Sequence, residues 1–391
     1  MNFKNICIEP SQKVAWITRT IAAALLCGFA FSGRLWITSR LFPLAPVSDS
    51  LPAIPPPMDY GLMFLLAGLL LAIIMAAKPA KFILLFVALA VLWCLWDQTR
   101  WQPWLYQYLA MLTGLGLYAG KNDQEALNCC RLVMICTYFW SGLQKLNINF
   151  ARETWPDIAG SLFRFLPPVV RNLPAFVVLS IPLLEICVGL GLATRRYRNA
   201  AVALAAVTHV FILVLLASSG ENTVVWPWNL AMVFFVVMLF WQDRQTAAPA
   251  LLFSKRAFHR LVLLLFGLMP VLSFFNLFDS YLSLALYSGN TDQAVIYVTP
   301  AVIDMLPAAI HPHIWQQTSP FFLDINRWAY GELNVPVYPE PRIYRKVAEQ
   351  ICSYAMNSPD VRLRIKEKPN PFTGARRSEY YDCGHLQEVG R

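Results

Sequence analysis

Charged residues are scarce in this chain of 391 residues: only 14% are Asp, Glu, Lys or Arg, whereas 57% are hydrophobic. The mean hydropathy of +0.48 is far above that of soluble globular chains, which excludes an ordinary soluble enzyme and a nucleic-acid-binding protein. The chain also lacks a phosphate-binding glycine-rich loop, a CxxC pair, an HExxH helix and a nucleophile elbow. These absences leave an integral membrane protein.

Long apolar segments are abundant instead. Since about 20 apolar residues cross a bilayer as a helix, the sequence predicts an all-α polytopic membrane bundle of about nine transmembrane helices over residues 1–285. Lys and Arg in the short loops favour a cytoplasmic N-terminus, and an odd number of spans then places residues 286–391 outside. The apolar segments lie near 15–33, 60–77, 80–96, 103–120, 128–147, 175–193, 199–218, 225–241 and 261–280.

Residues 286–391 have a different pattern and predict a small α+β extracytoplasmic domain. Residues Arg342 to Met356 are amphipathic at helical spacing, and Val361 to Lys366 alternate apolar and basic side chains as a strand does. Cys352 and Cys383 lie here, whereas the other cysteines fall in the predicted spans or on their cytoplasmic side. Because an oxidising compartment lets these two cysteines pair, we predict a disulfide between Cys352 and Cys383; the alternative is two buried free thiols.

The outer connection over residues 148–174 is more than a linker. Its apolar side chains recur at helical spacing, which suits a helix lying in the membrane interface. Such a helix either covers the ends of the spans or gates a cavity that opens toward lipid. The residues on this face are Trp155, Ile158, Leu162, Phe163 and Leu166.

Metal-binding signals are weak. His311 and His313 flank Pro312, but two histidines without further ligands do not indicate a metal site, so we predict no metal ion. The adjacent cysteines Cys129 and Cys130 favour packing over redox chemistry, because they face a reducing compartment. The cluster Trp226-Pro227-Trp228-Asn229, with its two tryptophans, favours an aromatic belt at the membrane interface over a cofactor clamp.

Three ionisable side chains lie inside the predicted spans: Lys145, Glu185 and His209. A charge at a helix centre costs about 2.5–3.5 kcal/mol on insertion scales, so such residues are candidates for function. Glu185 and His209 lie at similar distances in sequence from the same inner turn, about 15 Å along each helix. We expect them to form one hydrogen-bonded pair, and a purely structural tie between two helices is the alternative.

Lys145 lies near the outer end of its span. One interpretation is a lysine that extends its ammonium to the lipid headgroups. The other is a base: partial burial disfavours the ammonium, and a neutral amine at this depth could take a proton from a lipid-soluble phenol.

Three segments carry a resemblance to a known family: WDQTRWQPWLYQYL, YFWSGLQKLNINF and LLEICVGLGLATRRYRNAAVALAAVTH. Their residues and spacing resemble the vitamin K-dependent γ-glutamyl carboxylase family and its bacterial relatives with an HTTM-type membrane domain. The matching residues are Asp97, Trp101, Tyr106, Tyr108, Tyr138, Gly142, Lys145, Glu185 and His209.

The resemblance implies a mechanism. Lys145 falls on the family's catalytic base, which takes the phenolic proton of reduced vitamin K or a related naphthoquinol. Oxygen attack then yields a stronger base that removes a carbon proton from glutamate before carbon dioxide adds. His209, held by Glu185, would orient the quinone oxygen. The remaining residues would bind the quinone: Asp97, Trp101, Tyr106, Tyr108, Tyr138 and Gly142.

The match has departures, which keep other functions open. Trp104 stands where the family's carboxylases have a functional histidine, and the outer part is shorter than a propeptide-recognition domain. The alternatives are a quinone-linked oxidoreductase of the same fold and a non-enzymatic membrane accessory or maturation factor. Expected partners are membrane lipids, a quinone and a peptide or protein substrate on the outer face, with no nucleic acid. The expected location is a bacterial inner membrane, with the C-terminal domain in the periplasm.

Overall fold

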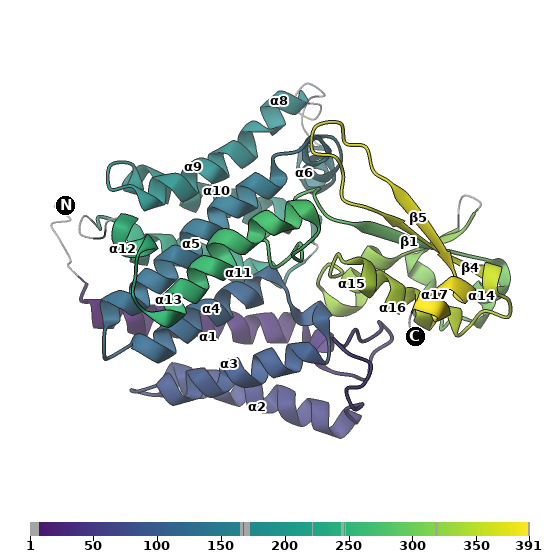
Figure 1. The fold of residues 1–391 in the computed structure, drawn as a ribbon, viewed down its shortest axis with the longest axis horizontal. Coiled ribbons are helices and arrows are strands. Elements are labelled where there is room, and N and C mark those ends of the chain that lie inside the picture. Colours follow the sequence, from purple (N-terminus) through teal and green to yellow (C-terminus); the bar gives the residue numbers. More distant parts are fainter. Residues whose placement is uncertain are drawn as a thin grey trace.

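The computed structural model describes residues 8–164, 167, 173–220, 222–243, 246, 248–316 and 320–389. Most of these residues are helical, and a small antiparallel sheet lies at one end of a helix bundle (Figure 1). The bundle helices are α1 (Pro10–Phe31), α2 (Pro56–Met75), α3 (Ala80–Leu95), α4 (Pro103–Tyr118), α5 (Asp123–Lys145), α6 (Trp155–Phe163), α8 (Ala175–Val178), α9 (Ser180–Ala193), α10 (Arg198–Ser219), α11 (Val225–Phe240), α12 (Ala248–Leu252) and α13 (Ala257–Val262), which continues with wider and tighter turns to Phe275.

The bundle has the composition of a membrane domain. Each apolar segment expected from the sequence is largely helical. Within the described part of the chain, six helical segments are long and apolar enough to cross a bilayer, while α3 and α11 are apolar but shorter. The count of nine spans and the placement of residues 286–391 outside the membrane stay predictions. The six segments are Pro10–Phe31, Pro56–Met75, Asp123–Lys145, Ala175–Ala193, Arg198–Ser218 and Ala257–Phe275.

Helix α5 is the central element of the bundle, packed against α9, α4 and α1. Two glycines let α9 approach α5 closely. A Cβ atom at Gly142 would lie 2.7 Å from the carbonyl oxygen of Pro182, and one at Gly189 would lie 2.9 Å from the amide nitrogen of Phe139. Because neither position has room for a side chain, the α5 and α9 backbones meet there, and side chains beside the contact face one another.

The sheet has the strand order β2-β3-β1-β4-β5, with every neighbouring pair antiparallel. Strand β4 coincides with the predicted strand, and α16, which begins one residue before the predicted amphipathic helix and ends four residues before its predicted end, packs against β4. Both predictions are confirmed. The elements of this part are β1 (Gln293–Val298), α14 (Pro300–Met305), β2 (Ile314–Trp315), β3 (Phe322–Asp324), α15 (Ile325–Leu333), α16 (Pro341–Cys352), β4 (Val361–Lys366), β5 (Ser378–Asp382) and α17 (Cys383–Val389).

A disulfide joins Cys352, the last residue of α16, to Cys383, the first residue of α17, with the Cα atoms 5.7 Å apart. The predicted pairing is confirmed, and the alternative of two free thiols is wrong. The bridge fixes α17 and the edge strand β5 against the helix that covers the sheet.

The sheet region is bound to loops at one end of the bundle. The Glu332 carboxylate of α15 accepts hydrogen bonds from the backbone amides of Leu41 and Phe42, at 2.6 and 2.9 Å. Arg342 at the start of α16 forms an ion pair with Asp279 and donates to the Gln98 side chain. These contacts position the sheet beside the same end of α5 that carries Lys145 (Figure 1).

Candidate functional site

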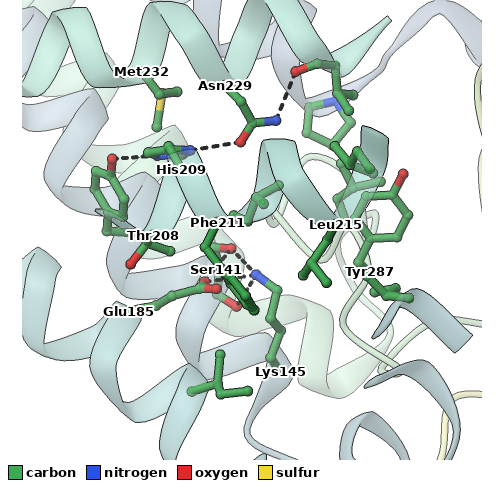
Figure 2. A pocket seen from close by; sticks show the side chains of 18 of the residues that line it. Ser141, Lys145, Glu185, Thr208, His209, Phe211, Leu215, Asn229, Met232 and Tyr287 are labelled. Carbon is green, nitrogen blue, oxygen red and sulfur yellow. Dashed lines mark hydrogen bonds and ion pairs between the residues drawn. The ribbon is translucent and has the colours of Figure 1, made fainter. Parts of the chain in front are cut away.

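A cavity of about 150 Å³ lies where α5, α6, α9, α10 and α11 meet residues 284–287. Its walls are mainly aliphatic and aromatic side chains, including Phe211, Leu215 and Met232. Polar groups gather in two places on this wall, shown in Figure 2. One cluster surrounds Lys145, and the other surrounds His209.

The first cluster joins α5 to α9. Lys145 Nζ lies 2.8 Å from Glu185 Oε2 and also donates a short hydrogen bond to the Ser141 hydroxyl, one turn earlier on α5. The Ser141 hydroxyl in turn donates to Glu185 Oε2 over 3.0 Å. Both charged side chains are nearly buried, with 12% and 11% of their surface exposed. Lys145 is therefore not a lysine that extends its ammonium to the headgroups.

The second cluster is a chain of hydrogen bonds from α5 through α10 to α11. His209 Nε2 lies 2.6 Å from the Tyr138 hydroxyl, and His209 Nδ1 lies 2.8 Å from Asn229 Oδ1. Asn229 uses its amide nitrogen to donate to the Val225 carbonyl over 2.8 Å, so its oxygen faces the histidine as an acceptor. This assignment places the proton of a neutral imidazole on Nδ1 and leaves Nε2 to accept from Tyr138.

The expected hydrogen bond between Glu185 and His209 is wrong. Glu185 binds Lys145 and Ser141, while both ring nitrogens of His209 bind Tyr138 and Asn229. The physical reason is the rotation of α9 about its axis. The sequence distance from the inner turn predicts only how deep Glu185 lies in the membrane. The close contact at Gly142 sets which face of α9 lies against α5, and Glu185 is on that face. Both residues still line the same cavity.

The other residues expected to bind a cofactor divide into two groups. Tyr138 lines the cavity, whereas Gly142 belongs to the contact between α5 and α9. Tyr106 stacks on Phe266 with ring centroids 4.3 Å apart and meets Trp101 edge to face. Tyr108 packs edge to face on Phe235. The side chains of Trp101, Tyr106 and Tyr108 are absent from the described wall of this cavity.

Asp97 lies outside the long helices, where its contacts hold two loops together. Its buried carboxylate lies 2.5 Å from the Arg40 guanidinium, 3.8 Å from that of Arg100 and 2.7 Å from the Thr99 hydroxyl. Burial acts to raise the pKa of Asp97, but the two guanidinium groups and the Thr99 hydroxyl outweigh it and hold the pKa below its ordinary value. Asp97 thus joins the loop after α1 to the start of α4.

Trp104 is a packing residue. It is almost fully buried, and a Cβ atom at Gly28 of α1 would lie 3.3 Å from its ring. It also meets Trp36 edge to face, with ring centroids 6.4 Å apart. A side chain of this size fills the space between α1 and α4 and gives Trp104 a role in core packing.

Four residues that line the cavity are not predicted from the sequence as site residues: Ser141, Trp228, Asn229 and Tyr287. Asn229 and Trp228 belong to the segment interpreted as an interfacial belt, which stays a prediction. The Trp228 indole donates to Gln107 over 2.8 Å. A polar Asn in an apolar helix is the signal that could have identified this partner of His209.

The helix expected in the outer connection is α6, which follows a π-helical turn over residues 150–154. Its Trp155 and Ile158 side chains line the cavity, and Leu162 and Phe163 pack on the same small core. Leu166 lies outside the described residues. The helix thus forms one wall of the cavity.

Comparisons with protein-family models, with curated proteins and with solved structures find no match to this chain. The resemblance to the carboxylase family therefore stays a prediction, and the function must be argued from the cavity itself.

Proposed function

We propose that the protein is a membrane enzyme that binds a reduced naphthoquinone in this cavity, deprotonates it with the Lys145–Glu185 pair and couples its oxidation to carboxylation of glutamate. The observation that carries the proposal is an amine and a carboxylate, 2.8 Å apart, on the wall of an otherwise apolar cavity. Ionisable groups inside a membrane domain are costly and mark functional sites.

The cavity fits an aromatic ring by size and lining. An engineered apolar cavity of about 150 Å³ in another protein holds benzene, so a volume of about 150 Å³ admits one aromatic ring, and a fused second ring requires the wall side chains to move apart. The apolar walls suit the ring, and the two polar clusters suit the oxygens at its edges. Bound there, a reduced naphthoquinone would be oxidised by molecular oxygen, which would generate a base strong enough to take a proton from the glutamate carbon that then adds to carbon dioxide.

The paired residues can move a proton without creating net charge. In the resting pair Lys145 is an ammonium and Glu185 a carboxylate. Transfer of one proton from Lys145 Nζ to Glu185 leaves a neutral amine, which then accepts the phenolic proton of the ligand. With the ligand's proton on Lys145 and the transferred proton on Glu185, the total charge of the two residues and the ligand together would be unchanged. The Ser141 hydroxyl, which contacts both groups, holds them in line.

The second cluster is suited to orientation. The Tyr138 proton is directed at His209 Nε2, so the Tyr138 oxygen offers lone pairs to a hydroxyl in the cavity. Asn229 fixes the imidazole through Nδ1. His209 is therefore a positioning residue for Tyr138 in this proposal.

The test is quinol-dependent incorporation of labelled carbon dioxide into an acidic peptide, measured in nanodiscs. We expect incorporation in the wild type and a loss of about 10²-fold or more in Lys145→Met, since a general base contributes at least this factor. Lys121→Met is the matched control, because Lys121 is exposed beside the start of the same helix. Retention of quinone binding in Lys145→Met shows that the variant is folded.

Two outcomes would replace the proposal. Lys145-dependent consumption of quinol and oxygen without incorporation would assign a quinone-linked oxidoreductase. Wild-type inactivity in both assays, with no quinone bound, would favour the accessory-factor alternative.

A further inference from the structure

A second cluster of reactive side chains lies at the opposite end of α5. Glu125 and Cys129 are one turn apart on α5, and His259 of α13 faces both of them. Cys129 and His259 are fully buried, and 12% of the Glu125 side chain is exposed. Cys129 lies 16 residues from Lys145, about 24 Å along the helix, so this cluster is separate from the cavity.

The hydrogen bonds of His259 place a nitrogen lone pair against the Glu125 carboxylate, and a cation between the two would remove the repulsion. Its Nε2 lies 2.6 Å from the Leu251 carbonyl, which only accepts, so Nε2 carries a proton. In a neutral imidazole Nδ1 then presents a lone pair, yet it faces Glu125 Oε1 at 3.0 Å and Cys129 Sγ at 3.6 Å. A lone pair against a carboxylate is repulsive unless a proton or a metal ion lies between them.

The spacing of the three side chains accommodates a metal ion. A proton on Nδ1 would satisfy Glu125 alone, whereas the ligand atoms of all three residues lie within 4.8 Å of one another. Zn–S and Zn–N bonds of about 2.3 and 2.0 Å at a tetrahedral angle place sulfur and nitrogen about 3.5 Å apart. The observed separation of 3.6 Å between Cys129 Sγ and His259 Nδ1 matches that value.

Neighbouring groups hold the three ligands in place. The Ser254 hydroxyl donates to Glu125 Oε1 over 2.6 Å, and the Leu251 carbonyl fixes the imidazole. A Cβ atom at Gly114 of α4 would lie 2.9 Å from the Cys129 Cβ, so the α4 backbone closes the far side of the cysteine. Hydrogen bonds from a ligand histidine to a carbonyl are the usual outer support of a metal site.

We propose that Glu125, Cys129 and His259 bind a Zn²⁺ ion that joins α5 to α13. On binding, the Cys129 thiol releases its proton to water, and the thiolate and the Glu125 carboxylate together balance the charge of the ion. A neutral site of this kind suits a buried position. Three protein ligands leave the fourth tetrahedral position to a water molecule.

The experiment measures metal binding by the full chain in detergent, without reference to any catalytic activity. The protein is loaded with Zn²⁺, dialysed, and its zinc content determined; a parallel Co²⁺ titration follows the thiolate-to-cobalt absorption band. We expect about one ion per chain in the wild type and at least about a tenfold loss of affinity in Cys129→Ser and in His259→Gln. Cys130→Ser is the matched control, since Cys130 is equally buried but outside the cluster.

Two results would overturn the proposal. One is a Cys129→Ser protein that keeps the wild-type zinc affinity. The other is a wild type that gives no thiolate-to-cobalt band, in which case His259 is an imidazolium paired with Glu125. The second result needs no variant, so the test stands even if a substitution prevents folding.

Discussion

At the scale of residues, the cavity depends on two side chains that are each unfavourable alone. Lys145 and Glu185 contact one another inside a mainly apolar wall, and Ser141 binds both. Removing one partner of such a buried pair leaves an uncompensated charge, whereas a neutral isostere keeps the shape of the site. Conservative variants are therefore the informative ones.

Glu185→Gln should lower kcat for quinol consumption by about 10²-fold or more and leave the KM for quinol nearly unchanged, because the amide cannot accept the Lys145 proton. The measurement is steady-state turnover in nanodiscs. Glu153→Gln, in the turn before α6, is the control and should keep wild-type turnover. A Glu185→Gln enzyme with wild-type kcat would remove the carboxylate from the proton path.

The buried Asp97 carboxylate gives a prediction about stability and pH. Its pKa is below the ordinary 3.8 in the folded protein. The ionised group therefore stabilises the fold above about pH 4, and this contribution is lost as the pH falls through the folded pKa. Asp97→Asn should cost about 3–5 kcal/mol at neutral pH, since it leaves Arg40 buried without its counterion.

Thermal unfolding in detergent across the acidic range checks this expectation. The difference between wild type and Asp97→Asn should shrink as the pH drops below about 4. Asp49→Asn is the control, because its carboxylate is mostly exposed in its contact with Lys346 and should change stability little. A pH-independent difference would contradict the assignment.

The residue scale also shows where sequence reasoning stops. The apolar runs in the sequence predict how deep Lys145, Glu185 and His209 lie, and all three residues line one cavity. The apolar runs do not predict the rotation of each helix about its axis. For this reason the predicted partner of Glu185 is His209, whereas the observed partner is Lys145. The three-residue cluster around Cys129 was invisible as well, because His259 is distant in sequence and belongs to another helix.

At the scale of elements, the contact between α5 and α9 decides the geometry of the site. Small residues at a helix interface let two backbones approach closely. Gly142 of α5 lies against Pro182 and Gly189 of α9 lies against Phe139, and the Lys145–Glu185 pair lies one turn from Gly142. The motif around Lys145 predicts a cofactor role for Gly142, because a motif shows that a glycine is required but not which neighbour requires it.

Gly142→Ala should destabilise the protein by about 1–3 kcal/mol and lower quinol turnover, since the added methyl group would overlap the α9 backbone and displace Glu185 from Lys145. Gly68→Ala in α2 is the matched control, because a Cβ atom there meets nothing within 4 Å. Thermal unfolding and turnover of both variants provide the measurement. Equal behaviour of the two would show that the helix contact tolerates separation.

Elements of the sheet region were predicted more fully than those of the bundle. Strand β4 alternates buried and more exposed side chains, and α16 has a strongly amphipathic sequence, so local pattern and tertiary position agree. The short strands β2 and β3 carry little periodicity, and their pairing depends on contacts distant in sequence.

At the scale of the whole molecule, the disulfide connects the C-terminal elements to the rest of the sheet. Cys352 and Cys383 close a loop with a sequence separation of 31 residues. A Cys352→Ala/Cys383→Ala variant should lose about 2–4 kcal/mol of stability in the sheet region, because the unfolded chain is no longer constrained.

Thiol labelling without reductant checks the bridge directly and should leave both cysteines unmodified. Hydrogen exchange should then report faster opening of β5 and α17 in the double variant, with the bundle helices unchanged. Labelling of both cysteines in the untreated wild type would show that the bridge is absent.

The pairing of Lys145 with Glu185 also bears on the history of this sequence. A lineage that lost only the lysine would keep a solitary carboxylate inside the membrane domain, and one that lost only the glutamate would keep a solitary ammonium. Either intermediate has an unpaired buried charge, which lowers its stability. Descendants should therefore retain both residues or replace both. Among relatives of this chain, these two positions should change together, and a chain that changes only one of them should carry a compensating charge nearby.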